Sequence, residues 1–198
     1  IIFSFMFFVV SKISPLVSCN KYILHGKKGE IVFPSQLDDL WLANTNKPTL
    51  EKTKLLFVGR VKKEKGIYSL IDILKSNNQL DNLTMVGAEN KINKENFKNI
   101  NIIEIIKNKK ELIDLYDEHN IFVLPSYTEG HPMVLLESLA RLRPVIVFDE
   151  INYVAKNKKG VFVSSRNADS FFEKIDYIMN NYDKIQSEMK KNILPENK

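Results

Sequence analysis

The sequence contains few of the residues on which disulfide-linked, zinc-binding or fibrous proteins depend. Among its 198 residues there is one cysteine, Cys19, so a disulfide within the chain and a zinc site with several cysteines are both excluded. Glycine and proline number 7 each, which excludes collagen and proline-rich low-complexity chains. The uncharged apolar run Ile1–Val10 is shorter than the about 20 residues that a membrane-spanning helix requires.

What is present is the composition of a globular chain with a mild basic excess. Hydrophobic residues make up 44% and charged residues 27%, and the length suits one domain or one domain with part of another. The net charge is +5 and the pI is about 9.1. Such an excess is typical of proteins that bind nucleotide phosphates, acidic lipids or nucleic acid. Because the lysines are spread along the whole chain, the excess can equally have no specific partner. Aromatic and basic residues do not interleave along one face, so we do not expect nucleic acid as a partner.

The apolar run at the start of the sequence admits two interpretations. The β-branched and aromatic residues of Ile1–Val10 favour a buried strand. The segment Leu16–Cys19 also resembles a lipoprotein cleavage box behind a hydrophobic segment, but the basic residues that open a signal peptide do not precede the run. Because the chain begins at Ile1 rather than at methionine, we expect it to be a fragment or a processed product.

After a polar connector at residues 44–53, short apolar runs alternate with amphipathic stretches. The pattern predicts strands at Lys54–Val58, Leu83–Val86, Asn101–Ile106, Ile121–Leu124, Val145–Phe148 and Val161–Ser164, and helices at Ile67–Lys75, Lys110–Glu118, Pro132–Arg141 and Ser170–Asn180. Because strand and helix alternate and the strands are apolar on both faces, the sequence predicts an α/β, Rossmann-like three-layer domain with a parallel sheet. In such sheets, ligands bind at the carboxyl ends of the strands.

Two cations follow the first of these strands. Gly59 allows a ligand to approach the backbone, and Arg60 and Lys65 could neutralise a diphosphate, the first through its planar fork and the second as a point charge. Spacing alone slightly favours a solvated charged loop over this site. Gly87, after the second strand, is expected to form a strand-end turn that keeps the cleft open.

A second candidate site lies in the loop Ser126–Pro132, between a strand and a helix. The free N–H groups at the start of the helix favour an anion there, and Gly130 removes the side-chain barrier to it. Glu129 could act on a ligand, or could simply be a favourable charge at a helix N-terminus. Glu137 lies within the apolar part of the helix and therefore requires partners, either the neighbouring hydroxyls of a sugar or ribose, or a structural salt bridge.

These segments together resemble a known family. The run NIFVLPSYTEGHPMVLLESLARLRPVIVF resembles the donor-binding signature of the retaining glycosyltransferases of glycosyltransferase family 4. The segments KLLFVGRVKKEKG, LTMVGAEN, ELIDLYDEHN and KGEIVFPSQLDDLW are similar to the family's phosphate loop, second strand, pre-signature helix and inter-domain segment. The motifs occur in the family's order and extend over Gly29–Asn180, which makes the resemblance more specific than any one of them.

The resemblance implies a GT-B fold, in which two Rossmann-like domains face a cleft and the second holds a nucleotide sugar such as a UDP- or GDP-sugar. Arg60 and Lys65 would bind the donor diphosphate. Glu129 would hold hydroxyls of the transferred sugar, and Glu137 would hold those of the ribose. Of these, the expected catalytic residues are Arg60, Lys65 and Glu129. The further donor-binding residues would be Gly59, Gly87, Gly130, His131, Met133 and Val134.

The resemblance also implies a role and a place for the chain. It implies a hexosyltransferase of polysaccharide biosynthesis that retains the anomeric configuration, needs no metal, and acts on a sugar, glycan or lipid-linked saccharide as acceptor. Such an enzyme is expected in the cytoplasm, at the inner membrane surface where its acceptor is a lipid. Residues 1–28 would be a remnant of the N-terminal acceptor domain, and residues 29–198 the donor-binding domain.

The sequence departs from the family's usual pattern at several positions. His131 stands where Phe or Leu is usual, Arg141–Arg143 replace a Cys-Gly pair, and Asp149–Tyr153 replace a Gly-Gly-Pro turn. A glycine that usually follows the third strand is replaced near Ile106, which bears on the base pocket. These departures, with most of an acceptor domain missing, leave open a second interpretation: a non-enzymatic nucleotide- or glycan-binding module on the same scaffold.

Overall fold

The computed structural model describes residues 16–18, 28–31, 37–88 and 97–194. The strands are β1 (Val17–Ser18), β2 (Glu30–Ile31), β3 (Leu55–Val58), β4 (Leu83–Ala88), β5 (Asn101–Glu104), β6 (Ile121–Leu124), β7 (Val145–Phe148) and β8 (Val161–Ser164). The α-helices are α2 (Asp39–Leu42), α3 (Ile67–Ser76), α4 (Lys109–Glu118), α5 (Met133–Ala140), α6 (Ala168–Asn180) and α7 (Tyr182–Met189). The 3-10 helices are η2 (Lys63–Lys65), η3 (Leu80–Asn82) and η5 (Asp149–Ala155).

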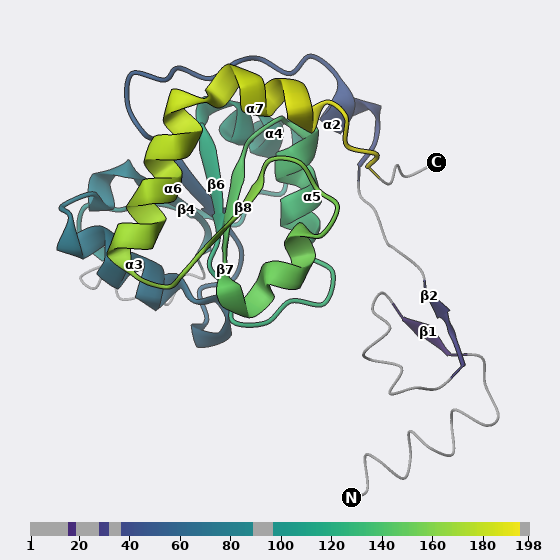
Figure 1. The fold of residues 1–198 in the computed structure, drawn as a ribbon, viewed down its shortest axis with the longest axis horizontal. Coiled ribbons are helices and arrows are strands. Elements are labelled where there is room, and N and C mark those ends of the chain that lie inside the picture. The colour runs from purple at the N-terminus through teal and green to yellow at the C-terminus, as the bar shows by residue number, and fades with distance from the viewer. Residues whose placement is uncertain (1–15, 19–27, 32–36, 89–96, 195–198) are drawn as a thin grey trace, which may run out of the picture.

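The centre of the structure is a parallel six-stranded sheet with the order β5-β4-β3-β6-β7-β8 (Figure 1). Leu55 of β3 lies opposite Leu83 of β4 on one side and opposite Ile121 of β6 on the other. Strands β4 and β5 follow β3 on one side of the sheet, and strands β7 and β8 follow β6 on the other side. The direction in which the chain adds strands therefore reverses between β3 and β6. Ligands of open parallel sheets bind at this reversal, beyond the carboxyl ends of the strands.

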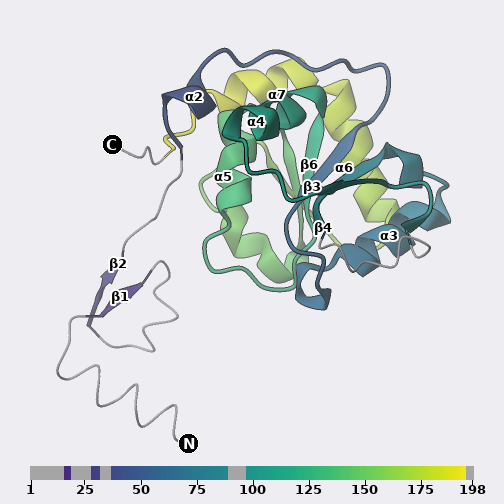
Figure 2. The same cartoon turned by 180° about the vertical axis from the view of Figure 1, so that it is seen from behind.

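Helices cover both faces of this sheet (Figures 1 and 2). Helix α3 packs against α6 on one face, and α4 lies beside α5 on the other. All residues of β6 and β7 are buried between the two layers. The predicted helix Ile67–Lys75 corresponds to α3, and its apolar face is buried as well. The buried residues of this face include Ile67, Leu70, Ile71 and Leu74. The prediction of an α/β three-layer domain with a parallel sheet is therefore confirmed.

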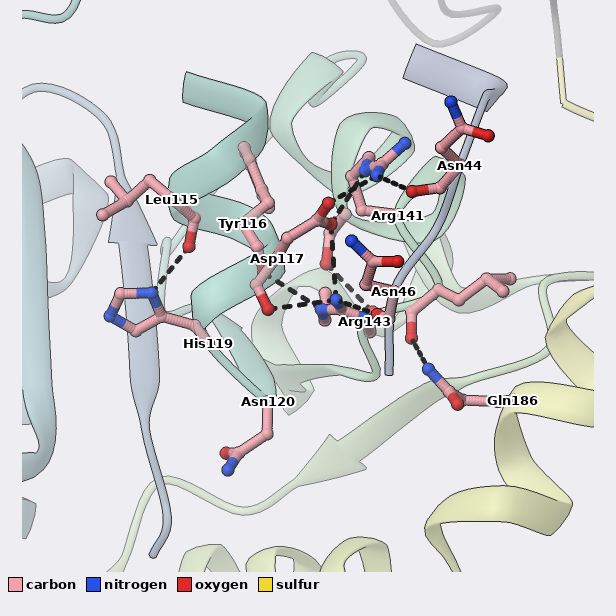
Figure 3. A network of polar contacts seen from close by, with 12 residues as sticks. Asn44, Asn46, Leu115, Tyr116, Asp117, His119, Asn120, Arg141, Arg143 and Gln186 are labelled. Atoms are coloured by element: carbon pink, nitrogen blue, oxygen red, sulfur yellow. Dashed lines mark hydrogen bonds and ion pairs between the residues drawn. The ribbon is translucent and has the colours of Figure 1, made fainter. Parts of the chain in front are cut away.

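At the amino ends of the strands, two buried arginines bind residues 41–46 to the rest of the domain (Figure 3). Arg141 donates to the carbonyls of Trp41, Ala43 and Asn44 at 2.6–3.1 Å. Arg143 donates to the carbonyl of Asn46 at 2.6 Å and to that of Tyr116 at 3.0 Å. The carbonyls of Ala43, Asn44 and Asn46 belong to a segment without helix or strand, so the arginines supply hydrogen bonds that secondary structure does not.

The carboxylate of Asp117 lies between these two guanidinium groups. It accepts bonds of 2.9 and 2.5 Å from Arg141 and one of 3.3 Å from Arg143. Leu142, between the two arginines, has a φ of 54°, a left-handed conformation that is uncommon for residues other than glycine. Leu142 therefore adopts a backbone conformation that glycine favours.

Several elements differ in detail from the sequence predictions. Pro132 is the N-cap of α5 rather than part of its first turn. Strand β4 continues through Gly87, where a bulge shifts its register against β5, so Gly87 lies within the strand and not after it. Helices η5 and α7 were not predicted at all. His119 and Trp41, a histidine and a tryptophan outside the predicted site, are both buried.

The first part of the chain contributes one short pairing. Strands β1 and β2 form a separate parallel pair, with Val17 opposite Glu30 (Figure 1). The apolar run Ile1–Val10, Cys19 and His25 lie outside the described residues. In the part of the chain that the structure describes, no helix has the length and apolar character needed to cross a bilayer.

Candidate functional site

The site lies where the strand order reverses, between the loops that leave β3 and β6. The loop after β3 runs from Gly59 to Gly66, and the loop after β6 from Pro125 to Pro132. The amide of Tyr127 in the second loop donates to the carbonyl of Glu64 in the first at 3.0 Å. The two segments that the sequence singled out, far apart along the chain, are thus in direct contact.

The closest polar contact between the two loops joins a cation to a carboxylate. Lys65 Nζ lies 2.7 Å from Glu129 Oε1, and the side chains are 24% and 9% exposed respectively. The hydroxyl of Ser126, which is fully buried, donates to the same carboxylate oxygen at 2.6 Å. Glu129 Oε1 therefore accepts from two side chains, and the Lys65 ammonium group has two further N–H donors.

Arg60 occupies the exposed outer part of the first loop, directly after β3. Beneath it, Gly59 and Gly87 bring the ends of β3 and β4 close together, since the amide of Gly59 donates to the carbonyl of Val86 at 2.9 Å. A Cβ at Gly87 would lie 2.6 Å from the carbonyl oxygen of Gly59, so only glycine permits this approach.

The start of α5 faces the same edge. Its N-cap is Pro132, which has no side-chain group to cap the helix, so the first N–H groups and the positive end of the helix dipole are available to an anion. Met133 and Val134 are partly buried there, and Gly130 is exposed immediately before them. His131 is half-buried in the same loop. The predicted donor-binding residues of this segment therefore lie in one continuous turn.

Glu137 lies deeper, on the buried face of α5, and is 6% exposed. Its partner is the hydroxyl of Tyr116 on α4, which donates to Glu137 Oε2 at 3.0 Å. Burial raises the pKa of Glu137, and the hydrogen bond from Tyr116 offsets part of that rise. Burial also raises the pKa of Tyr116, which keeps its hydroxyl protonated as a donor. Among the described residues, Glu137 forms no salt bridge, which was one of its two expected kinds of partner. Its partner is instead the hydroxyl group of Tyr116.

The side chains that the two loops bring into contact are those of Lys65, Ser126 and Glu129. Among the described residues, no three His, Cys, Asp or Glu side chains are grouped so that they could hold a metal ion. Comparison with known sequences assigns the family: a profile described as glycosyl transferases group 1 matches residues 42–194. The chain belongs to this family.

Curated relatives agree with the family and are longer than this chain. The capsular polysaccharide biosynthesis glycosyltransferase CapM of Staphylococcus aureus is 31% identical over 63% of this chain and 36% of its own length. An N,N'-diacetylbacillosaminyl-diphospho-undecaprenol alpha-1,3-N-acetylgalactosaminyltransferase of Campylobacter jejuni is 24% identical over 82% of this chain and 44% of its own. The chain therefore spans less than half the length of these two relatives.

Solved structures agree on the fold. The sucrose-phosphate synthase of Thermosynechococcus elongatus superposes with a TM-score of 0.67 at 17% sequence identity. The superposition covers 93% of this chain and 54% of the synthase chain. Anabaena HepE, solved in complex with UDP and glucose, matches 89% of this chain and 57% of its own with a TM-score of 0.65, at 12% identity. The sheet of this group 1 glycosyltransferase chain is thus of the kind found in GT-B glycosyltransferases.

Sequence reasoning missed two residues of the site. Tyr153 of η5 and Arg166, after β8, both contact the loop after β6. Each follows a predicted strand at the carboxyl edge of the sheet, so position was the signal that could have found them. Their contacts depend on side-chain directions that the strand pattern does not determine.

The raised pKa of Glu137 predicts a pH-dependent effect of replacing this residue. Below the ordinary pKa of a glutamate, the folded and unfolded chains both bind the proton, and the carboxyl group costs nothing. As the pH rises through the raised pKa, the folded state must ionise a buried group, and stability falls. Glu137→Gln should remove this loss, so the gain in stability of the variant over the unmodified chain should be larger at pH 7 than at pH 4. Urea denaturation of both proteins at the two pH values measures this gain. The same gain at pH 4 and pH 7 would contradict the prediction.

Proposed function

We propose that this chain is the donor-binding part of a retaining glycosyltransferase, which transfers a sugar from a nucleoside diphosphate to an acceptor. The observation that carries the proposal is the convergence of Lys65, Glu129 and the uncapped start of α5 at the reversal of strand order. A nucleotide sugar presents an anionic diphosphate next to neighbouring hydroxyls. Cations and helix N–H groups suit the first, and a fixed carboxylate suits the second.

The proposed roles follow from position. Arg60 and Lys65 bind the diphosphate, and the N–H groups of Met133 and Val134 add the dipole of α5. The carboxylate of Glu129 accepts from sugar hydroxyls while Lys65 and Ser126 hold it in place. Glu137 accepts from ribose hydroxyls.

The proposed reaction breaks the bond between the anomeric carbon and the terminal donor phosphate oxygen. The acceptor hydroxyl forms its new bond on the same face of the sugar through an oxocarbenium-like state, and its proton passes to the departing phosphate. Negative charge grows on the diphosphate as the bond breaks, so Arg60, Lys65 and the helix N-terminus stabilise the transition state more than the ground state. These cationic groups serve in place of a divalent metal, and we expect turnover without one.

The acceptor is proposed from the names of relatives. CapM is named for capsular polysaccharide biosynthesis, and the Campylobacter enzyme for a diphospho-undecaprenol-linked sugar. We propose a glycan or lipid-linked saccharide as the acceptor here as well. The chain spans under half of these relatives, so a second domain that binds the acceptor is a required partner in this proposal.

Calorimetric titration of the chain with UDP, GDP and ADP, without metal, tests the donor site. We expect one of the three nucleotides to bind. Arg60→Ala and Lys65→Ala should each lower the affinity for it about 10- to 100-fold, which is the effect of losing hydrogen bonds to charged groups. Lys63→Ala provides the matched control, because Lys63 is an exposed cation of the same loop and should barely change the affinity. Equal losses in all three variants would mean a non-specific charge effect, and no binding by the folded chain would defeat the proposal.

A further inference from the structure

Arg166 lies at the carboxyl edge of the sheet, two residues after β8, with its guanidinium group enclosed between two aromatic rings. The Cζ atom is 4.1 Å from the centre of the Tyr127 ring and 4.3 Å from that of Phe148. The side chain is 14% exposed. Stacking of this kind suits arginine rather than lysine, because the guanidinium is planar and weakly hydrated.

The hydrogen bonds of Arg166 join three separate parts of the carboxyl edge. Nη1 donates to the carbonyl of Pro125 at 2.9 Å and to the hydroxyl of Ser69 at 2.8 Å, and Nη2 lies 3.4 Å from the carbonyl of Ser126. Nε and Nη2 bind the two carboxylate oxygens of Glu150 at 2.8 and 2.9 Å. The carboxylate balances the buried charge, and the remaining N–H groups on Nη1 and Nη2 hold the backbone of the loop after β6.

Tyr153 holds the same loop at a second point. Its hydroxyl donates to the carbonyl of Glu129 at 2.5 Å and accepts from the amide of Glu129 at 3.0 Å. One side chain thus fixes both backbone polar groups of the residue whose carboxylate meets Lys65. The segment from Pro125 to Pro132 contains no helix or strand, so these side chains supply order that the backbone lacks.

We propose that Arg166 and Tyr153 are positioning residues that set the Glu129 carboxylate for the sugar of the donor. The proposal rests on the function proposed above. A carboxylate that binds two sugar hydroxyls must be placed to within about 0.5 Å, and such placement requires support from outside the loop. Lys65 and Ser126 fix the carboxylate itself, while Arg166 and Tyr153 fix the backbone that carries it.

The consequence is a selective effect on sugar binding. In the proposed function, the diphosphate is held mainly by Arg60, Lys65 and the start of α5. The hydrogen bonds of Arg166 and Tyr153 go to none of these groups. Loss of Arg166 or Tyr153 should therefore weaken the binding of a nucleotide sugar more than the binding of the nucleoside diphosphate alone. A merely structural role would instead lower both affinities together, or neither.

The test measures the affinity of the chain for a nucleoside diphosphate and for its sugar conjugate, in Arg166→Met, Arg166→Lys and Tyr153→Phe. We expect the preference for the sugar conjugate to fall about tenfold in Arg166→Met and Tyr153→Phe, and Arg166→Lys to restore little of it because lysine lacks the planar fork. Asp117→Asn is the control, since it destabilises the opposite edge of the sheet and should leave the preference unchanged.

A second measurement needs no ligand. Amide hydrogen exchange of residues 126–131 in the free chain should be faster in Arg166→Met and Tyr153→Phe. Unchanged exchange would overturn the proposal whatever the binding results, and faster exchange with an unchanged sugar preference would reduce the two residues to structural supports. If the unmodified chain binds no nucleotide, the proposed function fails and the positioning role fails with it, whereas exchange still shows whether the two residues order the loop.

Discussion

Replacing Asp117 by alanine should lower the free energy of unfolding by about 3–5 kcal/mol, the usual cost of removing one partner of a buried ion pair. The carboxylate receives two bonds from Arg141 and one from Arg143, and the arginine side chains are 2% and 1% exposed (Figure 3). Without Asp117, the two guanidinium groups remain buried without this negative charge beside them. Arg143 Nη1 already has no hydrogen-bond partner in the described structure, so the site has no spare acceptors. Urea denaturation measures the change.

The loss should extend to residues 41–46, because the same arginines bind the carbonyls of Trp41, Ala43 and Asn46. Proteolysis within residues 41–46 should therefore become faster in Asp117→Ala. Lys174→Ala is the matched control: it removes one partner of an exposed pair, and exposed pairs contribute little. A cost below about 1 kcal/mol for Asp117→Ala would mean that the desolvation of the Asp117 carboxylate cancels its attraction to the two arginines, contrary to this prediction.

The strands of the sheet were the part of the fold most accessible from the sequence. Ile121–Leu124, Val145–Phe148 and Val161–Ser164 were predicted with the bounds that the structure shows. A strand of a parallel sheet that is covered on both faces appears as an unbroken apolar run, and the polar residues around it mark its ends. The local pattern therefore contains all the information that these elements require.

The arginine pair was beyond the reach of the same reasoning. Arg141 and Trp41 lie 100 residues apart in the sequence, and their contact depends on where the connector crosses the finished domain. An arginine at the end of a helix is ordinarily a surface residue, so nothing in the local pattern indicates burial. The sequence showed only that Arg141–Arg143 depart from the family's usual residues.

The candidate site was predicted in part. Residue type and strand position placed Lys65 and Glu129 at one edge of the sheet, and the structure brings them to 2.7 Å across 64 residues of sequence. Their ion pair was not predicted, because each was assigned to a different part of the donor. Tyr153 and Arg166 were missed since their roles depend on rotamers and on the path of η5, which has no periodic sequence pattern.

Gly66→Ala should be the most damaging single change at the junction of the two loops. Gly66 has a φ of 67°, and a Cβ there would lie 1.8 Å from the carbonyl oxygen of Pro125. Left-handed strain and overpacking together should cost about 2–5 kcal/mol. Because the obstacle is backbone, the loop after β6 must move away, which separates Lys65 from Glu129. Nucleotide affinity should therefore fall along with stability, as urea denaturation and calorimetric titration would show.

Gly160→Ala separates the two causes. Gly160 also has a positive φ, 84°, but a Cβ there would meet the side chain of Met189, which can change rotamer. It lies at the opposite edge of the sheet, where its carbonyl accepts from the amide of Val145 at the start of β7. This variant should lose only the about 1–2 kcal/mol of left-handed strain and keep its nucleotide affinity. If Gly66→Ala behaves like Gly160→Ala in both measurements, the contact between Gly66 and Pro125 does not hold the two halves of the site together, because strain alone would then account for the loss.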